Sequence, residues 1–211
     1  MSENHITYIL KTARNIENPA LHEQALSAIL QMSEIDENRA LLTKRKALRI
    51  LSSCINMPLS ATCHKLAVLA IYRLSKDNDR RKTRLLRYEI LDRLIYFACS
   101  SQVINSSLKY WSIMLLHQFT LTDDSHAHLI EHDLINVFAT LAGQTFGETQ
   151  MQKICMHSLV RLLSSLEDAN GIDRDILVTN EVFKQLAELR IIMIISGCIR
   201  SGIVASLLRR H

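Results

Sequence analysis

The sequence predicts an all-α fold built from a repeated helical unit, and three observations support this prediction. The 211 residues include only 5 Gly and 2 Pro, where average usage gives about 15 Gly and about 10 Pro. A chain made of β-strands needs those residues in its many tight turns, so the composition argues against a sheet-rich fold. Hydrophobic residues make up 48% of the chain and recur at helical spacing, and similar segments return every 42 to 45 residues.

Four segments resemble one another and set this period. Each is apolar at helical spacing and ends with an apolar residue followed by Ser or Thr. These terminal apolar residues are Met32, Leu74, Phe119 and Leu163, with separations of 42, 45 and 44 residues, and a weaker fifth copy ends at Leu208. The four segments are HEQALSAILQMS (22–33), HKLAVLAIYRLS (64–75), YWSIMLLHQFT (110–120) and ICMHSLVRLLS (154–164).

A second segment recurs between these copies. RLLRYEILDRLIYFA (84–98) aligns without gaps on HLIEHDLINVFATLA (128–142), while residues 40–54 fit with one gap and residues 177–189 fit again. A helical period in the low forties is typical of the armadillo/HEAT class of solenoid. The stretch ENRALLTKRKALRILSSCI, followed by SATCHKLAVLAIYRLS, resembles an armadillo repeat with a short first helix, a second helix and a longer third helix.

The resemblance implies that residues 1–211 form a single domain, a right-handed α–α superhelix of about five repeats that starts incomplete near Ile6. One departure concerns the glycine that armadillo repeats usually carry between their first two helices. That glycine is absent here, and Lys46, Glu89, Asp133 and Glu181 stand near its position. The resemblance therefore leaves a HEAT-like or divergent variant open.

The junctions between helices carry capping residues. Asn18 precedes Pro19, which suits the first position of a helix because no N–H bond is lost there. Pro58 and Ser60 play the same part before the next third helix. Three aspartates are expected to cap the short first helices: Asp36, Asp77 and Asp123.

The cysteines and the N-terminus predict a cytoplasmic or nuclear location. The segment MSENHITYIL lacks the basic start and the long apolar run of a secretory signal. The five cysteines are scattered, never spaced as C-x-x-C, and lie in apolar helical patterns, so we expect buried reduced thiols. They are Cys54, Cys63, Cys99, Cys155 and Cys198.

No motif of an enzyme is present. The chain lacks a glycine cluster to hold a phosphate, which disfavours a Rossmann or P-loop enzyme, and it lacks a G-x-S-x-G motif. The metal-like cluster DDSHAHLIEHD (123–133) places His128 and His132 four residues apart, on one face of a helix. No catalytic glutamate or nearby cysteine completes this pair, so surface histidines are expected. The sequence predicts a non-enzymatic protein without a metal or cofactor.

The armadillo resemblance implies that the third helices line a concave groove in which partners bind as extended peptides. In the nuclear-import adaptors of this family, each third helix presents a Trp and, four residues later, an Asn. Neither type is found at the matching positions here, which argues against recognition of nuclear-localisation signals. The matching Trp positions are Ser27, Leu69, Met114 and Ser158, and the matching Asn positions are Gln31, Arg73, Gln118 and Leu162.

A different groove is predicted from these positions. Gln31, Arg73 and Gln118 are expected to form a polar ladder, because Gln donates and accepts as Asn does and Arg holds a carboxylate or carbonyl with a planar fork. Leu69, Met114 and Leu162 would add an adaptable apolar strip for a partner peptide or helix. The alternatives are solvated helix positions for the polar residues and core packing for the apolar ones.

Positive charge is concentrated in residues 39–93, which hold 14 Lys/Arg and 4 Asp/Glu, whereas the whole chain is only +4. Two runs supply the excess, and in a solenoid they would merge into one basic edge. Such an edge suits an acidic protein partner or, as the alternative function, a nucleic acid or an anionic membrane; a simple solvated face is the third interpretation. The edge consists of Lys44, Arg45, Lys46, Arg49, Arg80, Arg81, Lys82, Arg84 and Arg87.

The sequence thus predicts a protein-binding adaptor or scaffold that holds a peptide or helix of acidic character in the groove. The C-terminal stretch 191–208 has one charge, Arg200, in 18 residues. It is near the minimum length of a membrane span, but the central arginine favours a packed terminal repeat over a membrane anchor. An exposed end that pairs with another chain is the remaining interpretation.

Overall fold

The chain folds as an all-α protein in the computed structural model, which describes residues 3–144 and 149–168. These residues form eleven α-helices and one short 3₁₀ helix, with no strand among them. The chain divides into two compact units, Met1–His132 (unit 1) and Asp133–His211 (unit 2). Each unit is described by itself below.

Unit 1 contains nine α-helices within its described part, and the predicted third helices correspond to three of them, α2, α5 and α8. Its helices are α1 (Glu3–Thr12), α2 (Pro19–Met32), α3 (Asp36–Lys44), α4 (Ala47–Asn56), α5 (Ala61–Ser75), α6 (Asp79–Leu86), α7 (Leu91–Cys99), α8 (Ser106–Thr120) and α9 (His126–Glu131), with the 3₁₀ helix η1 (Asp123–Ser125) before α9.

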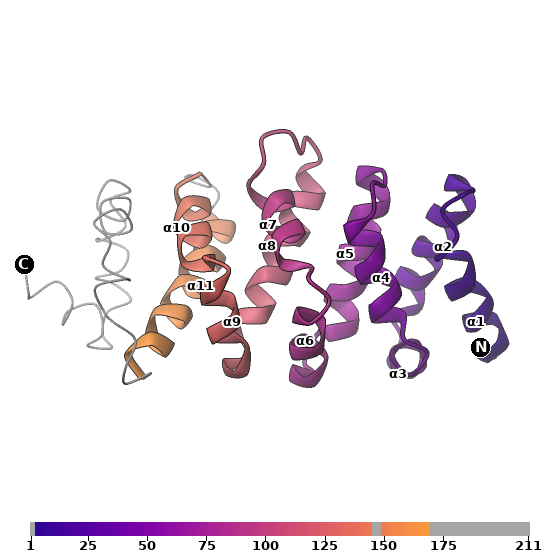
Figure 1. Cartoon of the computed structure of the whole chain (residues 1–211), viewed down its shortest axis with the longest axis horizontal. Coiled ribbons are helices and arrows are strands. Elements are labelled where there is room, and N and C mark those ends of the chain that lie inside the picture. The colour runs from indigo at the N-terminus through magenta and orange to yellow at the C-terminus, as the bar shows by residue number, and fades with distance from the viewer. Residues whose placement is uncertain (1–2, 145–148, 169–211) are drawn as a thin grey trace, which may run out of the picture. The chain divides into compact units, whose positions relative to one another are not determined.

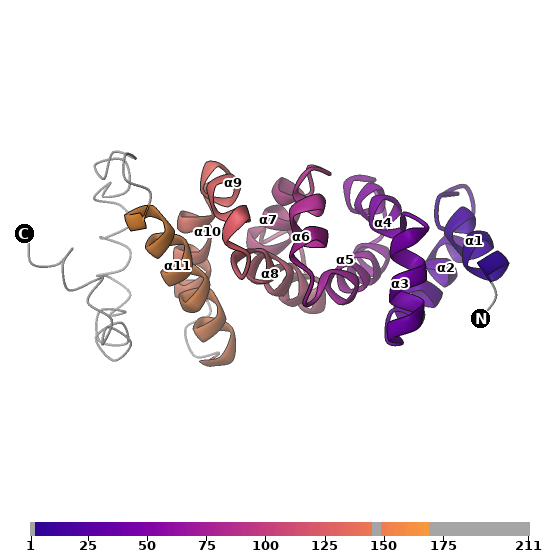
Figure 2. The same ribbon diagram turned by 90° about the horizontal axis from the view of Figure 1, so that it is seen from below.

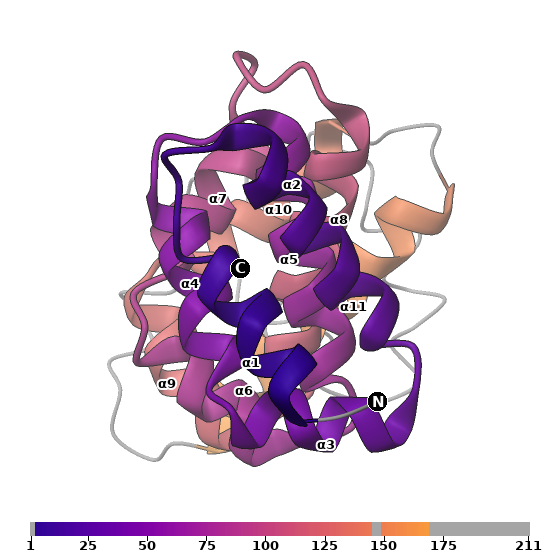
Figure 3. The same ribbon diagram turned by 90° about the vertical axis from the view of Figure 1, so that its right-hand side faces the viewer.

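The helices of unit 1 pack as a repeated three-helix group. The order short first helix, second helix and longer third helix occurs as α3–α4–α5 and again as α6–α7–α8 (Figure 1). The long helix α5 packs against both α2 and α8, while α4 packs against α5 and α7 against α8 (Figure 2). In Figure 3, α2, α5 and α8 lie on one side of unit 1, and α4 and α7 lie on the other side.

The residues that set the sequence period occupy equivalent places in the core. Met32, Leu74 and Phe119 lie at the C-terminal ends of α2, α5 and α8, and all three are buried. Full burial of such side chains stabilises the fold by about 1.5–3 kcal/mol each. The period read from the sequence is therefore a period of core packing.

The residues near the absent armadillo glycine have left-handed backbone angles. Lys46, Glu89 and Asp133 have φ of 65°, 53° and 59°, a region that glycine enters freely and that costs other residues about 1–2 kcal/mol. The chain thus keeps the backbone turn between first and second helices without the residue that makes it easy. Glu181 lies outside the described residues.

The capping predictions are confirmed for the third helices and wrong for the first ones. Asn18 and Ser60 accept hydrogen bonds from backbone N–H groups of α2 and α5. Asp77 does not cap α6, because its φ of 57° turns it away and the next residue, the extended Asn78, caps instead. Asp36 and Asp123 are the first residues of α3 and η1 and do not act as N-caps. A carboxylate at this position interacts favourably with the positive end of the helix dipole.

Each first helix of unit 1 sends one side chain back to the end of the preceding third helix. These three side chains are 42 and 45 residues apart, the same steps as the repeat, and they satisfy carbonyl groups that a helix end leaves unpaired. The three contacts are Arg39 Nη1 to Ser33 O at 3.0 Å, Arg81 Nη1 to Leu74 O at 2.8 Å and His126 Nε2 to Thr120 O at 2.7 Å.

Unit 2 contains α10 (Leu134–Gln144) and α11 (Thr149–Asp168), which pack against each other. Phe138 and Leu159 are buried, and the Gln152 side-chain amide donates to the Ala142 carbonyl at 3.5 Å. The predicted fifth repeat and the apolar stretch 191–208 lie outside the described residues. Within residues 3–144 and 149–168, no helix is long and apolar enough to cross a membrane.

Candidate functional site

The solvent-facing sides of α2, α5 and α8 form one surface, called here the third-helix face. On each helix the exposed and half-exposed residues recur at steps of three and four, which is the spacing of one helical face. The surface contains most of the groove residues predicted from the sequence together with three aromatic residues. It consists of Gln31, Leu69, Tyr72, Arg73, Tyr110, Trp111 and Met114.

An aromatic cluster joins α5 to α8 on this face. The Tyr72 and Trp111 rings lie 5.3 Å apart between centroids, and Tyr110 meets Trp111 edge to face at 5.1 Å. Burial raises the pKa of Tyr72, and the neighbouring Tyr110 raises it further. Tyr110 itself remains 38% exposed. The helical spacing alone could have located these rings, because Tyr72 follows Leu69 by three residues and Tyr110 precedes Met114 by four.

Arg73 connects α5 to the C-terminal end of α2. Its Nη1 donates to Glu34 Oε1 at 2.7 Å and lies 3.4 Å from the Leu30 carbonyl oxygen. The arginine is half-buried, so this ion pair is partly shielded from water. Arg73 therefore links α5 to the end of α2, and both contacts are made by the same guanidinium nitrogen.

The other predicted groove positions are placed differently from one another. Gln31 is exposed, and Leu69 and Met114 are half-buried. Leu162 of α11 is fully buried, so it packs in the core and adds nothing to an exposed apolar strip. Gln118 is only 4% exposed, and neither its amide nitrogen nor its oxygen has a hydrogen-bond partner among the described residues. Leaving such a buried amide unpaired costs about 1–3 kcal/mol. The polar ladder predicted from the sequence is thus exposed at Gln31, half-buried at Arg73 and buried at Gln118.

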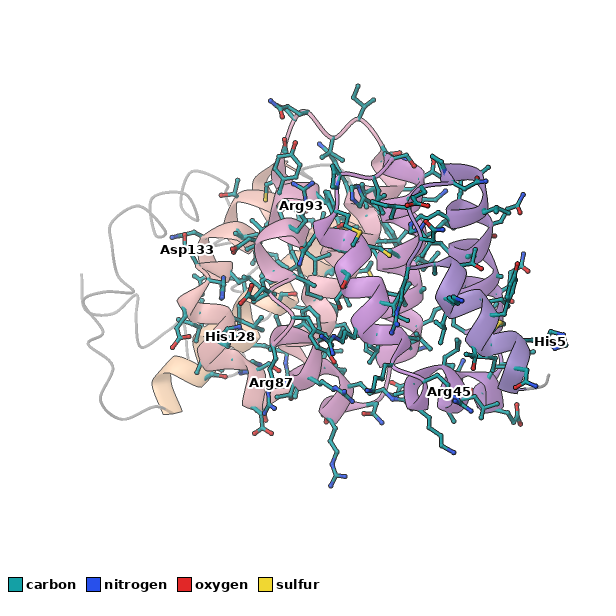
Figure 4. The ribbon with its side chains drawn as sticks, turned by 45° about the vertical axis from the view of Figure 1, so that its right-hand side comes forward. His5, Arg45, Arg87, Arg93, His128 and Asp133 are labelled. Carbon is teal, nitrogen blue, oxygen red and sulfur yellow. The ribbon has the colours of Figure 1, made fainter. Side chains whose placement is uncertain are left out.

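The two basic runs lie at the same end of unit 1. Arg45 and Arg87 both lie toward the end that carries α3 and α6, whereas Arg93 lies toward the opposite end (Figure 4). In the first run Lys44, Lys46 and Arg49 are all exposed. Burial lowers the pKa of Arg81 on α6, and the nearby positive charge of Arg39 on α3 lowers it further.

The second basic run is only partly available at the surface. Lys82 is buried with its ammonium 2.9 Å from Asp79 Oδ1, and Thr122 donates to the same oxygen at 2.8 Å. The Lys82 hydrogen bond, followed by that of Thr122, lowers the pKa of Asp79. Arg80, Arg84 and Arg87 are exposed and border a shallow cavity of about 480 Å³, which Asp79 and Asp124 also line.

The histidine cluster at 123–133 has mixed surroundings. His128 and His132 lie on one helix face as predicted, with ring centroids 4.7 Å apart, and His132 Nδ1 is 3.1 Å from Asp92 Oδ1. His126 is buried, which corrects the expectation that the histidines lie at the surface. Nowhere in the described part of the chain do three or more His, Cys, Asp or Glu side chains gather as metal ligands do.

The cysteines that the structure describes form no disulfide with one another. Cys54, Cys63 and Cys155 are buried and Cys99 is half-buried, while Cys198 lies outside the described residues. Burial raises the pKa of Cys54 to about 11 and also raises that of Cys99. The raised pKa keeps Cys54 and Cys99 protonated near neutral pH, and a thiol is a weaker nucleophile than a thiolate.

A cavity of about 550 Å³ opens between the loop before α5, helix α7 and the loop before α8. Its lining includes His64, whose Nε2 lies 2.9 Å from the Met57 carbonyl oxygen. The His64 ring centroid lies 4.7 Å from that of Phe97, with the two rings tilted by 40°. Burial lowers the pKa of His64, which keeps it neutral near pH 7. Arg93 also lines the cavity. Nothing in the sequence pattern distinguished these residues.

Comparisons with known proteins show the fold alone. No family model matches the chain, and no curated protein sequence matches it. Two crystal structures of engineered proteins, Northeast Structural Genomics Consortium targets OR329 and OR366, are similar, with TM-scores of 0.65 and 0.60 at 13% and 12% identity. The match with OR329 covers 77% of this chain but only 64% of that protein, and the match with OR366 covers 87% and 69%.

Proposed function

We propose that this chain is a non-enzymatic, armadillo-like adaptor that holds a partner peptide or helix on its third-helix face. The observation that carries the proposal is the aromatic cluster of Tyr72, Tyr110 and Trp111 beside half-exposed Leu69 and Met114. Aromatic side chains supply a large contact area at low entropic cost, and both aromatic residues and methionine are enriched in protein–protein interfaces. In an armadillo-like right-handed superhelix this face would be the concave one.

The proposed partner is acidic and apolar. The exposed cations of unit 1, such as Lys44 on α3 and Arg84 on α6, give it positive charge that would steer an acidic segment toward it. Met114 and the aromatic rings favour an apolar anchor in the same segment. A location in the cytoplasm or nucleus belongs to this proposal, because buried thiols such as Cys54 suit a reducing compartment.

The test begins with partner capture from cell lysate at about 0.5 M salt, where surface charge attraction is largely screened. Truncation of the captured protein identifies the shortest peptide that still binds, and the affinity of that peptide is measured by fluorescence anisotropy. We expect Tyr110→Ala to weaken binding about tenfold, the effect of losing one interface hot spot. Tyr8→Ala is the matched control, since Tyr8 lies on α1 and is 70% exposed.

Two outcomes would contradict the adaptor proposal. One is a peptide whose affinity is the same for Tyr110→Ala and for the native chain. The other is the absence of any protein partner at high salt together with binding of nucleic acid or anionic lipid at low salt.

The second outcome would favour a polyanion-binding module. The observation on its side is the group of exposed cations at one end of unit 1, Lys44, Lys46, Arg49, Arg84 and Arg87. Binding to a single-stranded oligonucleotide or to phosphatidylserine vesicles would then fall steeply with salt. A triple change of Lys44, Lys46 and Arg49 to Ser would reduce that binding, while Tyr110→Ala would not.

A further inference from the structure

The cavity beside Arg93 has a basic group without an acidic partner. Arg93 stacks over the rings of Tyr96 and Phe97, with its guanidinium carbon 5.3 Å from each centroid. Its Nε is buried and has no hydrogen-bond partner among the described residues. The residues that line the cavity include no Asp and no Glu. An oriented guanidinium of this kind is suited to a carboxylate, which takes two parallel hydrogen bonds from it.

The rim of the cavity adds an apolar surface. Ile104 is 94% exposed, the highest value among the exposed large apolar residues of the described chain, and Tyr96 is also exposed. The Tyr96 hydroxyl donates to Gln102 Oε1 at 3.1 Å, which ties the loop that carries Ile104 to helix α7. Ile104 and Tyr96 both line the cavity, so they offer an apolar contact to a side chain bound there.

We propose that this cavity is a second docking site, distinct from the third-helix face, which binds a peptide segment carrying an acidic side chain next to an apolar one. The carboxylate is held by Arg93, and the apolar side chain packs on Ile104 and Tyr96. Charge complementarity selects the acid, because the cavity offers a guanidinium without a lining carboxylate. Its volume of about 550 Å³ falls in the range of small binding sites and suits one or two side chains rather than a folded domain.

The site is independent of the proposed adaptor face. None of the residues lining the cavity belongs to the third-helix face, and Arg93 lies toward the end of unit 1 opposite Arg45 and Arg87. A partner protein is therefore able to use either surface alone.

The experiment follows the Arg93 Nε–H signal in a nitrogen-labelled NMR spectrum of the full chain. Two libraries of short blocked peptides are added, both with a fixed Leu, one with an adjacent Asp or Glu and the other with Asn or Gln. We expect the acidic library to shift the Arg93 signal and the amide library to leave it in place. Sodium acetate at the same carboxylate concentration should have a much smaller effect, since it lacks the apolar side chain.

Variants give the second readout with a peptide selected from the acidic library. Ile104→Ser should weaken binding by about threefold or more without unfolding the chain, because this side chain is almost wholly in solvent. Ile35→Ser removes another exposed isoleucine, at the start of α3, and should have no effect. Arg93→Lys keeps the charge but loses Nε–H and the planar fork, so it should weaken binding further than Ile104→Ser.

Four results would overturn the proposal. These are no shift with either library, equal shifts with both libraries, an acetate response as large as that of the peptides, or a peptide affinity that Ile104→Ser leaves unchanged. Tyr110→Ala separates this site from the adaptor face, because it should leave the acidic peptide response intact.

Discussion

The two basic runs of unit 1 have similar compositions but different structural roles. In residues 44–49 the cations Lys44, Lys46 and Arg49 extend into solvent. In residues 80–87, Lys82 is buried beside Asp79, and Arg81 is bonded to the end of helix α5. A count of positive residues therefore overstates the charge available to a polyanion, because Lys82 and Arg81 use their charged groups in contacts within the fold.

The largest expected effect is the loss of stability caused by Lys82→Ala. The aliphatic stem of Lys82 is buried, and removing its methylene groups costs about 2–3 kcal/mol at about 0.8 kcal/mol for each group. Urea unfolding of the full chain, followed by circular dichroism, measures this difference. Lys44→Ala is the control from the exposed run and should stay within about 0.5 kcal/mol of the native chain. Equal effects of the two variants would remove the distinction between the runs.

Arg81→Ala should produce the next largest loss. The guanidinium donates to the Leu74 carbonyl at 2.8 Å, and loss of this partly exposed bond costs about 1 kcal/mol. Arg80→Ala changes the neighbouring exposed cation and should have little effect on the same urea midpoint. A destabilised Arg80→Ala variant with an unchanged Arg81→Ala variant would show that the helix-end contact contributes nothing.

Lys46→Gly should raise stability, in contrast to both variants of the second run. The Lys46 backbone has a φ of 65°, and glycine relieves the cost of that conformation at some expense in unfolded-chain entropy. We expect a net gain of about 0.5–1 kcal/mol in the free energy of unfolding. Arg49→Gly, in the regular part of α4, should lose about 1 kcal/mol. A loss in both variants would mean that the Lys46 side chain has a structural role.

The smallest effect is a difference in acid sensitivity. The pKa of Asp79 is lowered below its usual value of 3.8, chiefly by Lys82 and then by Thr122. As the pH falls, the unfolded chain therefore takes up this proton before the folded chain does, so Asp79 contributes stability above the unfolded pKa and loses it as pH falls through the folded pKa. Between about pH 5 and about pH 3, the urea midpoint should fall less for Asp79→Asn than for the native chain.

Lys44→Ala is again the control, because Lys44 is an exposed cation of the first run and takes no part in the Asp79–Lys82 pair. Its midpoint should fall between the two pH values as much as that of the native chain. An Asp79→Asn variant as acid-sensitive as the native chain would show that the Asp79–Lys82 pair does not contribute.

Much of the fold was predictable because apolar residues recur along the sequence at the period of the repeat. The spacing of Met32, Leu74 and Phe119 identifies the ends of three long helices, since a repeated core position requires a repeated apolar residue. The left-handed turn at Lys46 was locatable by alignment alone, although no glycine marks it. The N-cap of α6 was not predictable from the sequence. Asp77 and Asn78 both have a side-chain oxygen that can cap a helix, and only their backbone angles determine that Asn78 does so.

The candidate site was predictable only in part. Alignment located Leu69, Arg73 and Met114 on the third helices, but the contact between Tyr72 and Trp111 joins residues far apart in the sequence. The partner of Arg73 was equally hidden, since Glu34 lies on the preceding repeat. Arg93 had no distinguishing sequence pattern, because its cavity is formed by two loops and a helix that meet only in the folded chain.

The sequence by itself determined the helical class, the period and the residues that fill the core, because these depend on local spacing and on the exclusion of apolar groups from water. The tertiary structure decided which polar groups remain available. Lys82 and Gln118 became buried and Arg81 became a helix-end contact, whereas Ile104 was left exposed. Exposure depends on what the neighbouring repeat covers, and that is a property of packing between segments rather than of any one segment.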